Sequence, residues 1–254
     1  MFIDTHAHLY LEQFDDDRSD VIQAATNAGI GKIFLPNIDS TTTNAMLATS
    51  QEFDGICYPM MGLHPCSVKE NFAEEIKHIE LQLAERQFYG IGETGIDLYW
   101  DKTYIEEQIK AFEIQIQFAI DTQLPIIIHS RDSLDITIQL IKKNQKGNLK
   151  GVFHCFNGTI EQCKQIQDTG FKMGLGGVVT YKKANLGSMI EQMSAENIVL
   201  ETDAPYLSPT PFRGKRNESQ RIVTIAEKVA EFRSMNLEAI EKLTTDNAKK
   251  LFAI

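Results

Sequence analysis

The stretch from residue 88 to residue 116, "FYGIGETGIDLYWDKTYIEEQIKAFEIQI", combines a buried strand with a helix. Its first ten residues form a short apolar run that is interrupted by glycines, which favours a buried strand. Apolar residues then recur at the spacing of one helix face, at Ile105, Ile109, Phe112 and Ile116. The stretch therefore predicts a strand followed by a helix, the repeating unit of α/β folds.

Similar units extend in both directions along the chain. Seven further runs of this kind occur at residues 2–8, 31–37, 55–65, 125–132, 151–158, 171–179 and 197–207. Longer stretches, several with helical spacing, separate the runs, so the alternation predicts a parallel sheet with right-handed crossovers. Eight units in 254 residues favour a closed (β/α)₈ TIM barrel. An open doubly wound sheet is the alternative, but no GxGxxG follows the first strand.

The organisation of the chain predicts one domain over residues 1–254. No linker rich in proline, glycine and serine, no charge block and no low-complexity tract divides the sequence. Residues 220–252 have the pattern of two amphipathic helices, which we expect to close the barrel.

Composition limits the classes of function. Lys and Arg total 25 against 35 Asp and Glu, a net charge of −10 that argues against a dedicated, tight nucleic-acid binder but allows transient handling of an end. The cysteines form no CxxC pair, which predicts free thiols in a reducing compartment. Neither a targeting segment nor an apolar run of about 20 residues is visible, so we expect a cytoplasmic protein without a membrane span. The cysteines are Cys57, Cys66, Cys155 and Cys163.

Polar residues gather at the carboxyl ends of the predicted strands, where TIM barrels place their active sites. Taken singly, His6 and His8 could be surface residues of a short edge strand and His129 and His154 could be core residues, but their common placement favours a metal site. His78 falls instead within a helical pattern and is expected on a helix surface. The five histidines at strand ends are His6, His8, His64, His129 and His154.

Two carboxylates strengthen the prediction of a metal site. Glu93 follows "YGIG" and Asp203 lies in "ETDAPYL", and a carboxylate in a barrel mouth is costly unless a cation or partner compensates it. Four histidines and two carboxylates exceed what one tetrahedral zinc needs and suit two adjacent divalent ions. We expect one histidine pair on each ion, Glu93 as the bridge and Asp203 on the first ion; nitrogen and oxygen ligands admit Mg, Mn or Zn. The predicted ligands are His6, His8, Glu93, His129, His154 and Asp203.

Six motifs occur in order along residues 2–217, and together they resemble the TatD-type metal-dependent DNases, within the amidohydrolase-like barrel hydrolases. The motifs are "FIDTHAHL", "GLHP", "GETGID", "LPIIIHSRD", "HCFNG" and "ETDAPYLSPTPFRGKRN". The resemblance implies a metal-dependent phosphodiester hydrolase, often an exonuclease on DNA, and places the same six residues on the metals. Single-stranded DNA or DNA ends are the expected substrate, with no obligate protein partner.

The chain departs from the usual family pattern at two places. Ala7 and Tyr10 stand where the family usually has a cysteine and an acid, and Glu218 rather than an early proline follows Asn217. None of these changes removes a ligand. We expect Tyr10 and the loop after Asn217 at the mouth of the site, where they would affect substrate preference.

The predicted site also assigns roles in catalysis and substrate binding. Two cations would lower the pKa of water, with Glu93 between them, while Asp203 orients that water and takes its proton. His64 and Arg131 are candidates to bind phosphate, although "HP" is also a common strand end and Arg131 has Asp132 as a possible ion-pair partner. The basic loop, residues 213–216, either guides a polyanion or is a solvated loop.

Two further functions remain open at this point. The same site chemistry serves hydrolysis of an amide or ester bond, and a metal-binding interaction protein without turnover would carry the same ligands. The glycines of "GLGG", residues 174–177, lack the lysine of a phosphate-binding loop and predict tight packing of the seventh strand instead.

Overall fold

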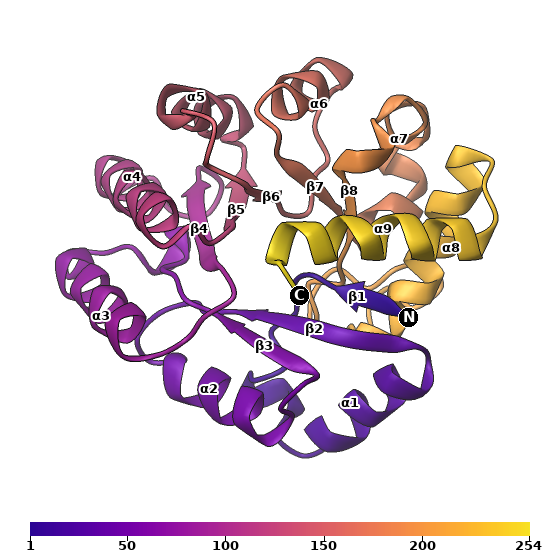
Figure 1. Ribbon diagram of the computed structural model, residues 1–254, viewed down its shortest axis with the longest axis horizontal. Helices are drawn as coiled ribbons and strands as arrows, with labels where there is room; N and C mark the ends of the chain where they lie inside the picture. The colour runs from indigo at the N-terminus through magenta and orange to yellow at the C-terminus, as the bar shows by residue number, and fades with distance from the viewer.

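The structure, a computed structural model that describes residues 1–254, confirms the predicted TIM barrel (Figure 1). Each predicted run overlaps one strand, and helices surround the ring, with α9 lying across one end. The strands are β1 (Phe2–Asp4), β2 (Ile30–Pro36), β3 (Cys57–Met60), β4 (Ile91–Asp97), β5 (Ile126–Arg131), β6 (Gly151–Phe153), β7 (Lys172–Leu175) and β8 (Ile198–Leu200).

Nine α-helices follow or connect the strands, and the predicted helix after residue 104 is α4. The α-helices are α1 (Arg18–Asn27), α2 (Thr43–Glu52), α3 (Phe72–Glu85), α4 (Ile105–Thr122), α5 (Leu134–Asn144), α6 (Ile160–Gln167), α7 (Gly187–Gln192), α8 (Ile222–Arg233) and α9 (Leu237–Phe252). The 3₁₀ helices are η1 (Glu12–Phe14), η2 (Pro65–Ser67), η3 (Gly177–Thr180), η4 (Lys182–Ala184), η5 (Ala195–Asn197) and η6 (Ser219–Arg221).

Two junctions close the ring of strands. Neighbouring strands pair in parallel within β1–β2–β3 and within β4 to β8. A parallel bridge between Met61 and Ile91 joins β3 to β4. At the other junction, the Thr5 amide donates to the Leu200 carbonyl at 3.0 Å, which joins β1 to β8. The closed ring excludes the open doubly wound sheet.

Helix α9 closes the end of the barrel opposite the strand carboxyl ends. Phe252, near its end, stacks on Phe34 of β2 with ring centroids 3.8 Å apart. Figure 1 shows α9 crossing in front of the strands, with the C-terminus near the middle of the ring. The two predicted C-terminal helices are therefore confirmed as α8 and α9. Residues clustered with this end of α9 include Ile3, Phe34, Ile127, Val152 and Val199.

Next to this apolar layer, the same strands present a layer of polar residues to the inside of the barrel. Side chains two apart on a strand point to the same side, so the residues after Ile127, Val152 and Val199 on the inner face are His129, His154 and Glu201. The apolar layer faces α9, and the polar layer faces the opposite opening of the barrel.

Glycines allow close packing next to this polar layer. At Gly95 of β4, with φ +141°, a Cβ atom would lie 2.0 Å from the carbonyl oxygen of His129. At Gly174 of β7, a Cβ atom would lie 2.0 Å from Oε2 of Glu201. The predicted tight packing of the seventh strand therefore holds at Gly174, whereas a Cβ atom at Gly176 would have room and Gly177 packs against Leu207 from η3.

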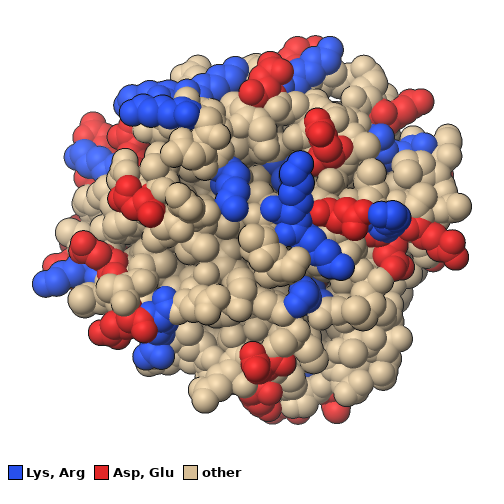
Figure 2. Space-filling model, in the orientation of Figure 1, with Lys and Arg blue, Asp and Glu red and all other residues tan.

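The face that α9 crosses carries acidic and basic side chains side by side, with a group of Lys and Arg near its middle (Figure 2). Lys249 and Lys250 lie in the last turn of α9, where positive charge complements the helix dipole. No helix combines the length and apolar character needed to cross a membrane.

All four cysteines are free thiols, as predicted.

Candidate metal centre

Five histidine rings surround the carboxylate of Glu93, which is only 2% exposed. Oε2 of Glu93 faces His6 Nε2 at 3.1 Å and His8 Nε2 at 3.3 Å. Oε1 faces the other side, with His129 Nδ1 at 2.9 Å and both His64 Nε2 and His154 Nε2 at 3.4 Å. The strand ends therefore bring together all five histidines that the sequence placed there. His78 lies on α3 and contacts Thr43 instead.

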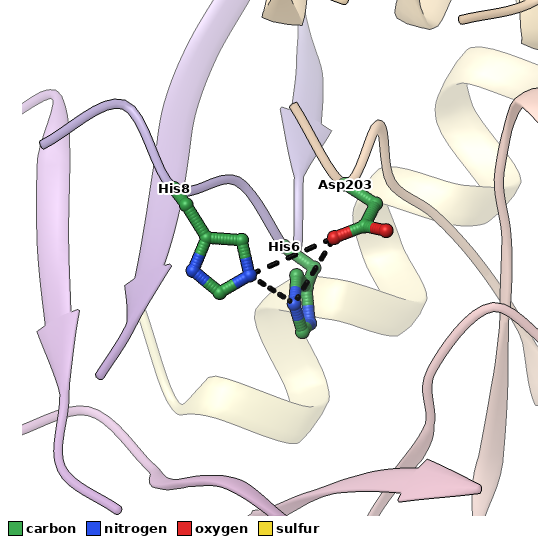
Figure 3. A group of neighbouring side chains, drawn as sticks. All are labelled: His6, His8 and Asp203. Atoms are coloured by element: carbon green, nitrogen blue, oxygen red, sulfur yellow. Dashed lines mark hydrogen bonds and ion pairs between the residues drawn. The ribbon is translucent and has the colours of Figure 1, made fainter. Parts of the chain in front are cut away.

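Asp203 completes the group on the Oε2 side (Figure 3). Its Oδ1 lies 3.7 Å from His6 Nε2 and 3.6 Å from His8 Nε2. The backbone of Asp203 adopts φ +59°, a left-handed conformation that is uncommon outside glycine and often found at functional sites. A hydrogen bond from the Asp203 amide to the His6 carbonyl, 2.8 Å long, holds this turn against β1.

Tyr10 orients the ring of His8. Its hydroxyl donates to the Pro36 carbonyl at 2.6 Å, so it accepts the hydrogen bond from His8 Nδ1 at 3.0 Å. The lone pair of His8 Nε2 is then free to face the centre, as a metal ligand requires. The expectation that Tyr10 lies at the mouth is wrong, because the chain after β1 turns inward and leaves Tyr10 only 2% exposed.

The loop after Asn217 is also not at the mouth. Asn217 is buried and donates from its side-chain amide to the Thr202 carbonyl at 2.8 Å. Glu218 pairs with Arg216, and Ser219 is buried. This loop braces the turn after β8 instead of contacting a substrate.

Glu201 orients the ring of His154. Its Oε1 accepts a hydrogen bond from His154 Nδ1 at 3.0 Å, so Nε2 of this ring also points its lone pair toward Glu93. Gly174 leaves the space that this buried carboxylate occupies. A carboxylate behind a ligating histidine is a common means of fixing the ring and raising its basicity.

We expect Glu201→Gln to weaken metal binding by about 10- to 100-fold, because the amide no longer polarises the His154 ring. A competition titration with a metal-binding dye measures this affinity. Glu227→Gln, an exposed residue on α8, is the matched control and should bind metal as the wild type does. An unchanged affinity in Glu201→Gln would contradict the positioning role.

Asp97 is a functional candidate that the sequence analysis missed. Its Oδ2 lies 2.9 Å from His129 Nε2, and its Oδ1 accepts the amides of Tyr99 and Trp100. Burial opposes ionisation of Asp97, but these hydrogen bonds hold the pKa of its carboxyl well below the usual range. The signal was available, because residues 93, 95 and 97 share one side of β4.

The charges of the centre call for a cation. Burial alone would raise the pKa of Glu93, but nearby His6, His64 and His154 hold it well below its usual value. Burial alone would lower the pKa of His154, but Glu201 and Glu93 raise it to about 10. In the metal-free chain, a proton on His154 thus offsets part of the acidic charge, and a divalent ion bound there would displace it.

The donor set fits divalent metal ions. Three groups of ligand atoms each lie close enough together to hold an ion: His6, His8 and Asp203; His6, Glu93 and His154; and His64, Glu93 and His129. Nδ1 of His6 and Oε2 of Glu201 are buried without a hydrogen-bond partner. Imidazole nitrogens and carboxylate oxygens suit zinc and manganese, and carboxylates also suit magnesium.

His64 differs from His8, His129 and His154 in carrying its hydrogen on the ring nitrogen that is nearer Glu93. The Cys66 amide donates to His64 Nδ1 at 3.1 Å, so the neutral ring carries its hydrogen on Nε2. This nitrogen lies 3.4 Å from Oε1 of Glu93, in a residue that lines the pocket, and as a donor it suits an anionic oxygen better than a metal ion.

Arg131 lies at the rim of the pocket. Its guanidinium stacks over the Tyr99 ring at 3.9 Å and forms no ion pair with Asp132. The pocket of about 650 Å³ that opens above the centre is lined by both His64 and Arg131, together with Trp100 and Tyr206.

The basic loop supplies fewer free charges than its sequence indicates. Arg216 is paired with Asp17 at 2.6 Å and with Glu218 at 3.4 Å. Arg213 lies over the Tyr181 ring at 4.2 Å, and neither it nor Lys215 has an ion-pair partner. A second hollow, lined by the loop, shares Tyr206 and Leu207 with the metal pocket. The unpaired side chains of Arg213 and Lys215 therefore lie next to the site.

Comparison with known proteins agrees with this geometry. The model of a family described as TatD related DNase matches residues 3–253. The chain belongs to the TatD-related DNase family. Like its relatives, this TatD-family chain is a metal-dependent hydrolase.

Individual TatD relatives match over their whole length. The uncharacterized metal-dependent hydrolase YabD of Bacillus subtilis is 36% identical, with 100% of both chains covered. The 3'-5' ssDNA/RNA exonuclease TatD of Pantoea ananatis is 27% identical, with 99% of both covered. The crystal structure of YjjV, a TatD homolog from Escherichia coli, superposes with a TM-score of 0.94 at 28% identity, covering 100% of this chain and 98% of that one.

Proposed function

We propose that this TatD-family hydrolase cleaves phosphodiester bonds of DNA as an exonuclease, using two adjacent divalent ions, Mg, Mn or Zn. The observation that carries the proposal is the division of the Glu93 carboxylate, whose two oxygens face separate groups of histidines. The name of the Pantoea ananatis relative, a 3'-5' ssDNA/RNA exonuclease, supports nucleic acid as the substrate class.

In this proposal Glu93 would contribute to holding both ions. His6, His8 and Asp203 would hold one ion, and His129 and His154 would hold the other. When bound, the cations supply the positive charge that lowers the pKa of a water and offsets charge developing on the phosphate.

Asp203 is the proposed general base. Its side chain is 13% exposed and lines the pocket, so its carboxylate can reach a water there. It accepts the proton as the water oxygen bonds to phosphorus and the bond to the leaving sugar oxygen breaks. His64 donates from Nε2, and Arg131 from its guanidinium, to non-bridging phosphate oxygens.

Metal analysis combined with a time course on end-labelled DNA tests this function. We expect stoichiometric bound metal and progressive shortening from one end that stops when the metal is chelated. Single-stranded and duplex strands, each labelled at either end, give polarity and strand preference. Hydrolysis of an amide or ester panel without cleavage of DNA would contradict the proposal, as would bound metal with no turnover of any substrate.

The basic loop is expected to steer DNA to the site. Arg213→Ala with Lys215→Ala should raise KM by about threefold to tenfold at low salt with less change in kcat, because exposed charges act at long range and are screened by ions. Kinetics over a series of salt concentrations measures the effect. Lys242→Ala, on α9 at the opposite end of the barrel, is the control. A salt dependence equal to that of the wild type would make the loop merely solvated.

A further inference from the structure

Exposed aromatic residues gather at the mouth of the metal pocket. Trp100 is 68% exposed and Tyr206 is 46% exposed, and both line the pocket. The six exposed large hydrophobic residues of the chain are Met1, Leu81, Tyr99, Trp100, Tyr206 and Leu207. Three of them line the pocket, and Tyr99 packs against Arg131 and Trp100 beside it. Exposed aromatic rings concentrated beside a polar site indicate a ligand that has flat apolar faces.

The Trp100 side of the mouth is held in place by Asp97, which contacts His129 of the metal centre. The amides of Tyr99 and Trp100 both donate to Oδ1 of Asp97, which binds His129 through its other oxygen. The Tyr99 and Trp100 rings meet edge to face, with centroids 4.9 Å apart. Arg131 stacks over Tyr99 and lies 5.2 Å from the Trp100 ring. These rings are exposed, yet their backbone is fixed.

Tyr206 lies on the other side of the same pocket. It follows β8, whereas Trp100 follows β4, and these strands are four positions apart in the ring of eight, which places them opposite each other. The Tyr206 amide donates to the Asp203 carbonyl at 2.7 Å, and its ring packs against His8 with centroids 6.2 Å apart. Both aromatic positions are thus tied to proposed metal ligands on opposite sides of Glu93.

We propose that Trp100 and Tyr206 stack on the two unpaired bases that flank the scissile phosphate of single-stranded DNA. The inference rests on the proposed function and names the form of its substrate. A phosphate at the centre has one nucleoside on each side, which is where the two rings lie. Bases inside a duplex already stack on their neighbours and have no free face to offer. Stacking accepts any base, so the site selects single strands without selecting sequence.

Fluorescence gives a direct test, because Trp100 is the only tryptophan in the chain. The probe is a short oligothymidylate, added to metal-loaded Asp203→Asn protein so that it is not consumed. We expect the oligothymidylate to quench the fluorescence and to bind more tightly than an abasic strand with the same number of phosphates. Equal quenching and equal affinity for the two strands would overturn the proposal.

Kinetics on the active enzyme provides the second test. Its measure is the ratio of kcat/KM for single strands with ordinary ends to that for strands with abasic ends. Trp100→Ala and Tyr206→Ala should each lower this ratio at least about fivefold, and Trp100→Phe should restore most of it, since phenylalanine keeps a π-face. Leu81→Ala, an equally exposed change on α3, should leave the ratio unchanged. A ratio near one in the wild type, or one that neither alanine variant lowers, would overturn the proposal.

The two proposals can fail separately. A wild-type enzyme that cleaves abasic and ordinary ends equally remains a nuclease but has no stacking site. Conversely, a protein that shows base-dependent quenching but cleaves no DNA has the stacking site and lacks the proposed activity.

Discussion

Glu93→Gln is expected to lose most of the bound metal and nearly all activity, with kcat/KM lower by at least about a thousandfold. An amide has the size of the carboxylate but not the negative charge that two cations need between them. The amide NH₂ group would also donate hydrogen bonds to the ring lone pairs that face the centre, and these lone pairs would then not be free for a metal ion. Elemental analysis of the purified variant and DNA hydrolysis under saturating metal measure the two effects.

A matched control separates loss of the bridge from general damage. Glu75 on α3 is also buried and accepts hydrogen bonds from the amide and hydroxyl of Ser40, but it lies outside the centre. Glu75→Gln should keep its metal and its activity, even if its thermal stability falls. Full metal content with wild-type turnover in Glu93→Gln would rule out a bridging carboxylate.

Asp203→Asn is expected to keep metal and DNA binding while kcat falls by at least about two orders of magnitude. The amide retains one oxygen ligand but cannot accept the proton of the attacking water, and general-base contributions of about 10²- to 10⁴-fold set the scale. Asparagine tolerates left-handed backbone as well as aspartate does, so the turn at φ +59° should survive. Turnover kinetics, together with DNA affinity by fluorescence anisotropy, measures both quantities.

Asp132 offers a closely matched control for this variant. It also adopts a left-handed conformation, with φ +56°, directly after β5, but its carboxylate is outside the group of ligands. Asp132→Asn should therefore retain activity. An Asp203→Asn enzyme that keeps its metal and cleaves DNA at more than about a tenth of the wild-type rate would show that Asp203 is only a ligand.

The barrel and the gathering of the candidate ligand residues at one end of it were predictable from the sequence because both depend on local order. Alternating strands and helices determine the ring, and the period of two along a strand determines which residues face its interior. Glu93 and His129 could therefore be assigned to one centre without knowledge of any contact between them. Their meeting follows from the strand order alone.

Side chains beyond the strand ends were less predictable, since their surroundings depend on the path of the loops. Tyr10 was expected at the mouth, but the chain turns inward and uses its hydroxyl to hold His8. Arg216 reads as a free charge in sequence, yet Asp17, far away along the chain, binds it. Asp97 was within reach of the strand pattern and was overlooked.

The junction between β1 and β8 links the proposed chemistry to the completion of the polypeptide. His6 and His8 emerge early in synthesis, whereas Asp203 and the Leu200 carbonyl that anchors Thr5 follow almost 200 residues later; the Thr5–Leu200 hydrogen bond spans 195 positions. Contacts of such long sequence separation slow folding, because the entropy of closing the chain must be lost before they form. A nascent or truncated chain thus holds unmatched fragments of the centre, and catalytic competence arises only when the first and last strands meet.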